Sequence, residues 1–151
     1  MNYSIGDVIK SIARIIHSGF PDYKIYVSAV PQGVDTPCFF ISFMPSSSKS
    51  QVDERIYSEL GLDIVFLMKP NEINATSIAY SIIEYLDENL EMIPYYEEGE
   101  QTGVMHSYDR NSHFEDMDLH YQATIKARGH IEDTGPLMEE LEAINYEIKV
   151  K

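Results

Sequence analysis

The chain has 151 residues, and its 25 Asp and Glu residues outnumber its 11 Lys and Arg residues, which gives a formal net charge of −14. This length predicts one domain with a hydrophobic core of its own. The acidic balance argues against a protein that binds duplex DNA or anionic lipid, because both need clustered Lys and Arg. A single cysteine, Cys38, excludes an internal disulfide and a multi-cysteine zinc site. The sequence also lacks an apolar run of about 18 residues or more, the length of a membrane helix.

Apolar residues at helical spacing open the chain. They form one stripe, which consists of Ile5, Val8, Ile9, Ile12, Ile15 and Ile16. The stripe predicts an amphipathic helix that ends near Gly19 and Pro21, and Ser4 with Asp7 is a weaker relative of the capping box. Two strands are predicted next: a short one at residues 23–28, and a central one at residues 38–44 that is apolar on both faces.

A low-complexity stretch, Pro45–Ser50, follows this central strand. Because strand-like residues resume by Ile56, we interpret the segment at about residues 45–54 as the mobile tip of a hairpin. Residues 55–68 then alternate between two faces, which predicts a strand that starts exposed and ends buried. One face of it carries Ile56, Ser58, Leu60, Leu62, Ile64 and Phe66.

A second helix is predicted from about residue 72 or 74 to about residue 91, with Asn71 or Asn74 as its cap and Pro94 as its stop. Residues 102–108 are a weak strand candidate, whereas the clean alternation of residues 117–127 predicts a strong, half-buried strand. Residues 144–150 alternate like a last strand. The segment at 137–142 fits either a helical turn or the start of that strand.

Two helices and five or six strands, many joined by hairpin-length connections, predict an α+β fold. We expect a single domain over residues 1–151, in which a mostly antiparallel mixed sheet carries both main helices on one face. The predicted core consists of Ile9, Ile12, Ile16, Phe39, Ile41, Leu62, Ile64, Phe66, Ile82, Leu86 and Ile125.

Histidines and carboxylates gather between residues 106 and 120, at His106, Asp109, His113, Asp116, Asp118 and His120. Such side chains can bind a divalent metal, and Asp116, Asp118 and His120 would point to the same side of a strand. The other interpretation is a polar loop followed by the solvent face of an amphipathic strand. No metal-ligand motif such as His-Glu-x-x-His is present, so we expect no metal site. A small metal-dependent enzyme that uses this cluster is the alternative.

Nucleophilic chemistry has less support. The serines of Pro45–Ser50 lack a Gly-x-Ser-x-Gly elbow, and the chain has no Gly-rich phosphate loop. Cys38 precedes two phenylalanines in an apolar strand, where a cysteine is usually a small buried hydrophobic residue and not a catalytic thiol. We therefore expect a protein that is not an enzyme and has no cofactor.

Two features indicate a surface for protein partners. Residues 84–100 hold seven acids and no base, which predicts a solvated acidic face or a face for a basic partner. The chain also has 11 Tyr and no Trp, and Tyr is enriched at interfaces because it buries area while its polar tip stays wet. The candidate interface residues, with the tyrosines expected to be exposed, are Ser46, Ser47, Ser48, Lys49, Ser50, Tyr57, Tyr95 and Tyr96.

Short motifs along the chain resemble a known family. Residues 23–26 are Tyr-Lys-Ile-Tyr, Gln32 and Gly33 follow, and residues 37–41 are Pro-Cys-Phe-Phe-Ile. The last residues carry Leu-Glu at 141–142, Ile-Asn at 144–145 and Ile-Lys-Val-Lys at 148–151. In these motifs, in length and in element order the chain resembles the phage tail terminator family of Bacillus-type prophages and tailed phages. It departs from the family pattern at residues 99–116, which we expect to be a long His- and Asp-rich loop.

The resemblance implies a small α+β structural subunit without catalytic residues. It implies a ring of identical copies, usually hexameric, at the neck of the virion tail, assembled in the cytoplasm of the bacterial host. The implied partners are other copies of the chain, the tail tube protein and head–tail connector proteins, with no membrane and no specific nucleic-acid binding. A head completion or connector subunit is the alternative within the structural class.

Overall fold

The computed structural model describes residues 2–27, 34–50, 56–128 and 130–132. Along these residues the elements are β1 (Asn2–Ser4), α1 (Ile5–Gly19), β2 (Lys24–Val27), β3 (Cys38–Ser50), β4 (Ile56–Leu67), α2 (Ala75–Asn89), β5 (Met92–Glu97), β6 (Glu100–Glu115), β7 (Asp118–Arg128) and β8 (His130–Glu132). The segments predicted at 137–142 and 144–150 lie outside the described residues.

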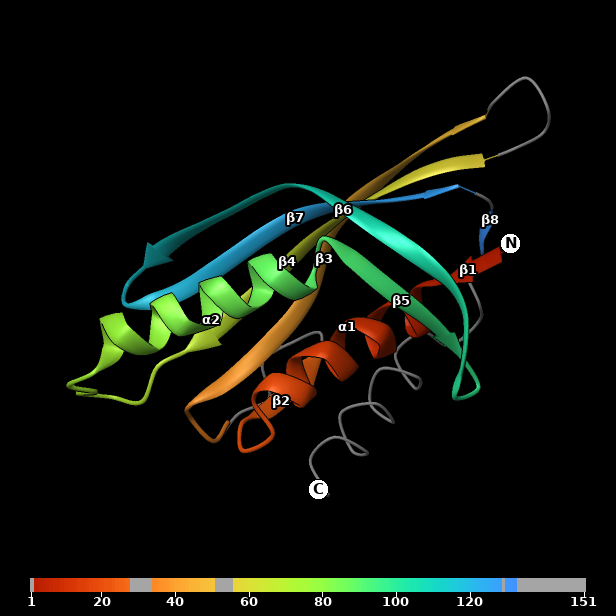
Figure 1. The fold of residues 1–151 in the computed structure, drawn as a ribbon. Helices are drawn as coiled ribbons and strands as arrows, with labels where there is room; N and C mark the ends of the chain where they lie inside the picture. Colours follow the sequence, from red (N-terminus) through yellow and green to blue (C-terminus); the bar gives the residue numbers. More distant parts are fainter. Residues whose placement is uncertain (1, 28–33, 51–55, 129, 133–151) are drawn as a thin grey trace.

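Six strands form one mixed sheet in the order β2-β3-β4-β7-β6-β5. Only the β2–β3 pair is parallel, and the other neighbours in this sheet run antiparallel. β1 and β8 pair in parallel as a separate two-stranded sheet. Figure 1 shows the six-stranded sheet curving around α1 and α2, which lie on the same face of it. The predicted α+β class, with a mostly antiparallel mixed sheet and both helices on one face, is confirmed.

α1 begins where the sequence predicts, because Ser4 caps it. The Ser4 hydroxyl accepts a hydrogen bond of 3.1 Å from the Asp7 backbone N–H and donates one of 3.0 Å to the Asp7 carboxylate. These bonds satisfy a free N–H group of the first turn, and the negative charge of Asp7 suits the positive end of the helix dipole. The helix ends at Gly19, where the close approach of the Tyr85 ring leaves no room for a Cβ atom.

α2 begins after Asn74, which occupies the capping position but makes no side-chain capping bond. Its side chains instead attach it to both neighbours. The Tyr85 hydroxyl donates to the Ile15 carbonyl of α1 at 2.6 Å, and Asp87 accepts a bond of 2.6 Å from the Tyr121 hydroxyl of β7. The helix is therefore positioned by its tertiary contacts more than by its cap. Neither described helix is long and apolar enough to cross a membrane.

The core lies between the helices and the sheet. All eleven residues predicted for the core are buried, with at most 2% of any of them exposed to solvent. A smaller cluster of Tyr26, Cys38 and Phe40, flanked by Val34, Val65 and Leu67, lies apart from this main core. Burial on both sides of β3 explains why residues 38–41 are apolar without alternation.

Two expectations about strands are wrong, and one strand was not expected. The stretch Pro45–Ser50 is not the turn of the hairpin, because β3 continues through it and pairs with β4 as far as Ser50 and Ile56. Residues 99–116 are not a loop, since β6 occupies almost all of them. The segment after Pro94 is likewise part of a strand, β5, which the sequence analysis did not predict. Residues 51–54 of the predicted hairpin tip lie outside the described residues.

β5 is held at the edge of the sheet by polar contacts with α1. The buried Tyr95 hydroxyl accepts a hydrogen bond from the Ser4 backbone N–H at 3.0 Å and donates to Asp7 at 3.4 Å. The Ser11 hydroxyl donates to the Asp7 carbonyl and accepts from the Tyr96 backbone N–H at 3.1 Å. Bonds between α1 and a segment some 90 residues later in the chain cannot be predicted from local sequence patterns.

Removing a large core side chain tests the assignment of the buried face. Phe66→Ala or Leu86→Ala should lower the free energy of unfolding by about 2–5 kcal/mol, because each leaves a cavity between the sheet and the helices. The matched control is Ile73→Ala, since Ile73 is 95% exposed; it should change the stability by less than about 0.5 kcal/mol. Chemical denaturation measures both, and a core variant as stable as the control would show that the face is misassigned.

The buried thiol predicts a specific dependence of stability on pH. Burial raises the pKa of Cys38 from 9.0 to about 11, so the folded state resists ionisation that the unfolded chain permits. This contribution to stability is complete below pH 9.0 and is lost as the pH rises towards 11. Denaturation of the wild type and of Cys38→Ala across this range should show the steeper loss in the wild type. Parallel profiles would contradict the prediction.

Candidate functional site

A β-bulge in β6 decides which side chains meet on the face of the sheet opposite the helices. Tyr108 pairs with Thr124 of β7, but the next pairing joins Asn111 to Gln122, so β6 holds one residue more than β7 in this interval. Asp109 within the bulge adopts a φ of 52°. The extra residue reverses the alternation of β6. As a result His113 stands directly opposite His120, and Glu115, two residues on, shares their face.

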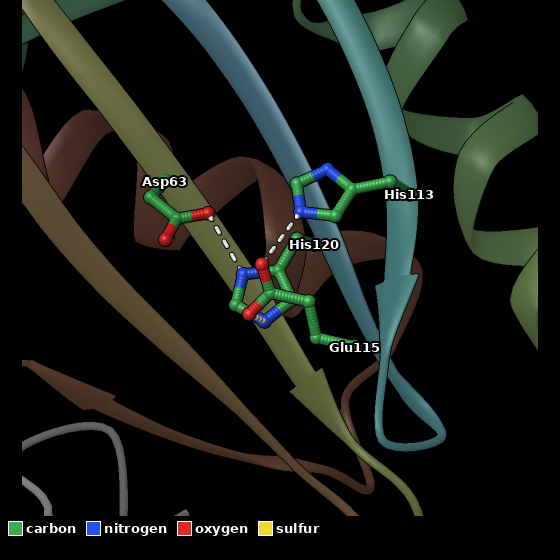
Figure 2. A network of polar contacts seen from close by, with 4 residues as sticks. All are labelled: Asp63, His113, Glu115 and His120. Carbon is green, nitrogen blue, oxygen red and sulfur yellow. Dashed lines mark hydrogen bonds and ion pairs between the residues drawn. The ribbon is translucent and has the colours of Figure 1, made fainter.

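These three residues form a compact cluster, shown in Figure 2. The His113 Nε2 atom lies 3.2 Å from one oxygen of Glu115, and the His120 Nε2 atom lies 3.4 Å from the other. The two imidazole rings stack at 5.1 Å between centroids with 10° between their planes. One ligand atom from each of the three residues fits within 4.8 Å of the others. The Glu115 carboxylate is thus shared by two histidines.

Asp63, on β4, completes the cluster from the far side of His120. Figure 2 shows the Asp63 carboxylate directed at the His120 ring. The Asp63 Oδ1 atom lies 3.4 Å from His120 Nδ1. This distance is short enough for an ion pair, but the geometry is not that of a hydrogen bond. The buried Asp63 oxygen therefore has no hydrogen-bond partner within the described part of the chain. Both ring nitrogens of His120 therefore face a carboxylate, and its side chain is only 17% exposed.

The structure brings together two of the six residues of the predicted metal cluster, His113 and His120. His106 lies farther along β6, opposite Lys126. Asp116 is in the turn before β7 with a φ of 49°, so the expected alignment of Asp116 with Asp118 and His120 on one strand is wrong. Burial raises the pKa of Asp118, although a hydrogen bond from the Met68 backbone N–H opposes the shift.

Sequence reasoning missed Glu115 and Asp63. The two-residue spacing of His113 and Glu115 is a readable signal only once residues 113–115 are known to be a strand. Asp63 interrupts the otherwise apolar end of β4. Its proximity to His120 comes from the pairing of β4 with β7, in which Val65 stands opposite His120.

The candidate interface residues fall into two groups. Ser46, Ser47, Ser48, Lys49, Ser50 and Tyr57 lie on the distal ends of β3 and β4, which project beyond the helices in Figure 1. The other group is on β5, where Tyr96 is half-buried beneath the Arg14 guanidinium at 4.2 Å from the ring centroid. The expectation that Tyr95 is exposed is wrong, because its ring is fully buried against α1.

The acidic run forms a solvated surface over α2 and the β5–β6 turn. Six of its seven acids are exposed, and Glu97 is half-buried. Two of them have neutral partners: Asp87 accepts from Tyr121, and Glu97 accepts from Thr102 at 3.0 Å. No ion pair with a described Lys or Arg is seen at any of the seven. Their charge thus faces solvent.

Comparison with known proteins gives one informative match. A solved structure aligns with 83% of this chain and 98% of its own, at 6% identity and a TM-score of 0.36, which is too low to support an argument. No curated protein matches the chain. The model of a protein family described as phage tail terminator protein matches residues 7–136, which span α1 through β8. The chain belongs to the phage tail terminator family and is a structural component of the virion tail.

Proposed function

We propose that this chain is the subunit of a homo-oligomeric, hexameric ring that caps the tail tube and forms the surface joined by the head. The family match over residues 7–136 carries the proposal. The ring would lie at the neck of the tail of a phage or prophage, after assembly in the host cytoplasm. Its partners would be the tail tube protein on one side and a head–tail connector protein on the other. The family match favours this role over a head completion subunit or a metal-dependent enzyme.

The projecting ends of β3 and β4 suit contact between subunits. In this segment the strands pair with each other from Ser47 and Glu59 to Ser50 and Ile56. Figure 1 shows them extending past the layer that the helices cover. Strands that leave the body of a subunit are free to reach a neighbouring copy or the tail tube. Ser, Lys and Tyr are residue types that can form hydrogen bonds with such a partner. We assign Ser46–Ser50 and Tyr57 to this interface, with Tyr96 at a second, half-buried position.

The acidic balance suits a ring through which DNA passes. A net charge of −14 and the solvated run at residues 84–100 offer DNA phosphates few cations to pair with. A lumen lined by such a surface would let the duplex slide without adhering. The proposed role accordingly includes no specific nucleic-acid binding.

Shortening the projecting strands tests the proposed subunit contact. Replacing residues 49–57 by Asn-Gly keeps Ser48 opposite Ser58 and closes the strands with a favoured two-residue turn. The removed residues include two bases and two acids, so the net charge stays at −14. The isolated subunit should unfold at nearly the wild-type temperature, because the pairing with β4 of the buried residues Cys38 to Ile41 remains. The association constant for ring formation, measured by sedimentation velocity, should fall at least tenfold.

The unfolding transition of the shortened subunit is the internal control. A variant that is stable and assembles as well as the wild type would remove the projecting strands from the interface. A variant that no longer folds would be replaced by Tyr57→Ala and Lys49→Ala in the full-length chain, which leave the strands in place.

Salt should strengthen the ring. Acidic subunits repel one another, and the Debye length falls from about 30 Å at 0.01 M to about 8 Å at 0.15 M ionic strength. Salt bridges between subunits would be weakened by added salt, but at exposed positions each contributes only about 0–1 kcal/mol. Sedimentation velocity across this range should therefore show more ring at the higher salt. The double variant Glu88→Gln, Glu98→Gln removes two exposed negative charges. It should therefore form the same fraction of ring as the wild type at a lower salt concentration. Rings that dissociate as salt is added would show that ion pairing governs the interface.

A further inference from the structure

We propose that His113, Glu115 and His120 form a binding site for one divalent transition metal, with zinc as the best-suited ion, and that Asp63 orients His120 within it. The proposal is independent of the ring and concerns the face of the sheet away from the helices.

The donor set matches zinc. Imidazole nitrogens and a carboxylate oxygen are ligands that Zn²⁺ binds at about 2.0–2.2 Å in tetrahedral geometry. Two ligands at such distances and at the tetrahedral angle lie about 3.3 Å apart. The two Nε2 atoms lie 3.2 and 3.4 Å from the Glu115 oxygens. Since all three ligand atoms lie within 4.8 Å of one another, a small rotation of the partly exposed His113 side chain and the exposed Glu115 side chain would bring them all to coordinating distance.

Asp63 has the position of an outer carboxylate at a zinc site. Histidine ligands usually donate their second ring N–H to a carboxylate or a carbonyl, which fixes the tautomer and the ring orientation. His120 Nδ1 faces Asp63 Oδ1 at 3.4 Å, which leaves Nε2 directed at Glu115. The Asp63 oxygen is buried and has no hydrogen bond within the described part of the chain. Metal binding at Nε2 would hold the proton on Nδ1, so that a small turn of the ring would give this oxygen a hydrogen-bond donor.

The backbone places the ligands before any metal arrives. His113 and His120 are cross-strand partners in adjacent, hydrogen-bonded strands, and the β6–β7 turn that follows Glu115 is only two residues long. Asp116 and Met117 in this turn both have positive φ. Three protein ligands leave a fourth position for water on the exposed side. A bound ion would therefore link the end of β6 to the start of β7.

The test measures metal binding by the full-length chain. After treatment with EDTA, equilibrium dialysis against ZnCl₂ should give one Zn²⁺ per chain, and CoCl₂ should give the visible absorption of tetrahedral Co²⁺. His120→Ala and His113→Ala should each weaken binding at least tenfold. Asp63→Asn should weaken it by about 10–100-fold, the usual effect of losing an outer partner. The matched control is His106→Ala, because His106 is an exposed histidine of the same strand; it should bind normally.

Three outcomes would overturn the proposal. The wild-type chain could bind no more zinc than His120→Ala does, or His106→Ala could lose as much zinc affinity as the ligand variants. The third outcome is one metal ion for two chains, together with a doubling of the mass in solution. The last result would mean that exposed histidines of two subunits share the ion. Circular dichroism of each variant separates loss of a ligand from loss of the fold. Ring formation by a variant that binds no zinc would leave the proposed tail function intact.

Discussion

Burial of one face of the sheet is the constraint on which the rest of this structure depends. β4 and β7 each bury one apolar series against the helices, including Leu62, Ile64 and Phe66 on β4 and Tyr121 and Ile125 on β7. Because a slip of one residue would turn such a series towards solvent, the buried face fixes the register of the central strands. Both helices must then lie on this face, where the Tyr85 hydroxyl of α2 meets the Ile15 carbonyl of α1.

The opposite face is consequently available for polar side chains, and it changes from apolar to polar along the sheet. Near β2 and the start of β3 it is apolar, with Tyr26, Cys38 and Phe40 buried together. Towards the β6–β7 turn it carries the cluster of His113, Glu115 and His120 with Asp63. A rigid sheet places these ligands better than a loop would, since the paired backbone restricts their positions. The proposed metal site and the proposed subunit contact therefore use different parts of the same sheet.

Irregularities in strand pairing give this sheet its specific surfaces. The bulge in β6 turns His113 and Glu115 towards His120. A second register shift, between Met44 and Ser47 of β3, coincides with Pro45, which cannot donate a hydrogen bond to a neighbouring strand. Beyond this shift, β3 and β4 continue into the segment that we assign to subunit contact. Bulges of this kind bend strands and redirect side chains, so a structural subunit can acquire new surfaces without changing its core.

The sequence by itself determined the two helices, the central strands and all eleven core residues, because burial against one face leaves a periodic pattern that can be read locally. It also indicated the family through short motifs around Pro37–Ile41. Only the tertiary structure decided the rest. β5 is a strand because it pairs with β6, and bonds that join Tyr95 and Tyr96 to Ser4 and Ser11 hold it against α1. The pairing of His113 with His120 depends on the one-residue bulge after Tyr108. Asp63 joins that pair because β4 lies beside β7. Contacts between strands far apart in the chain leave no local period, and for that physical reason no pattern in the sequence could predict them.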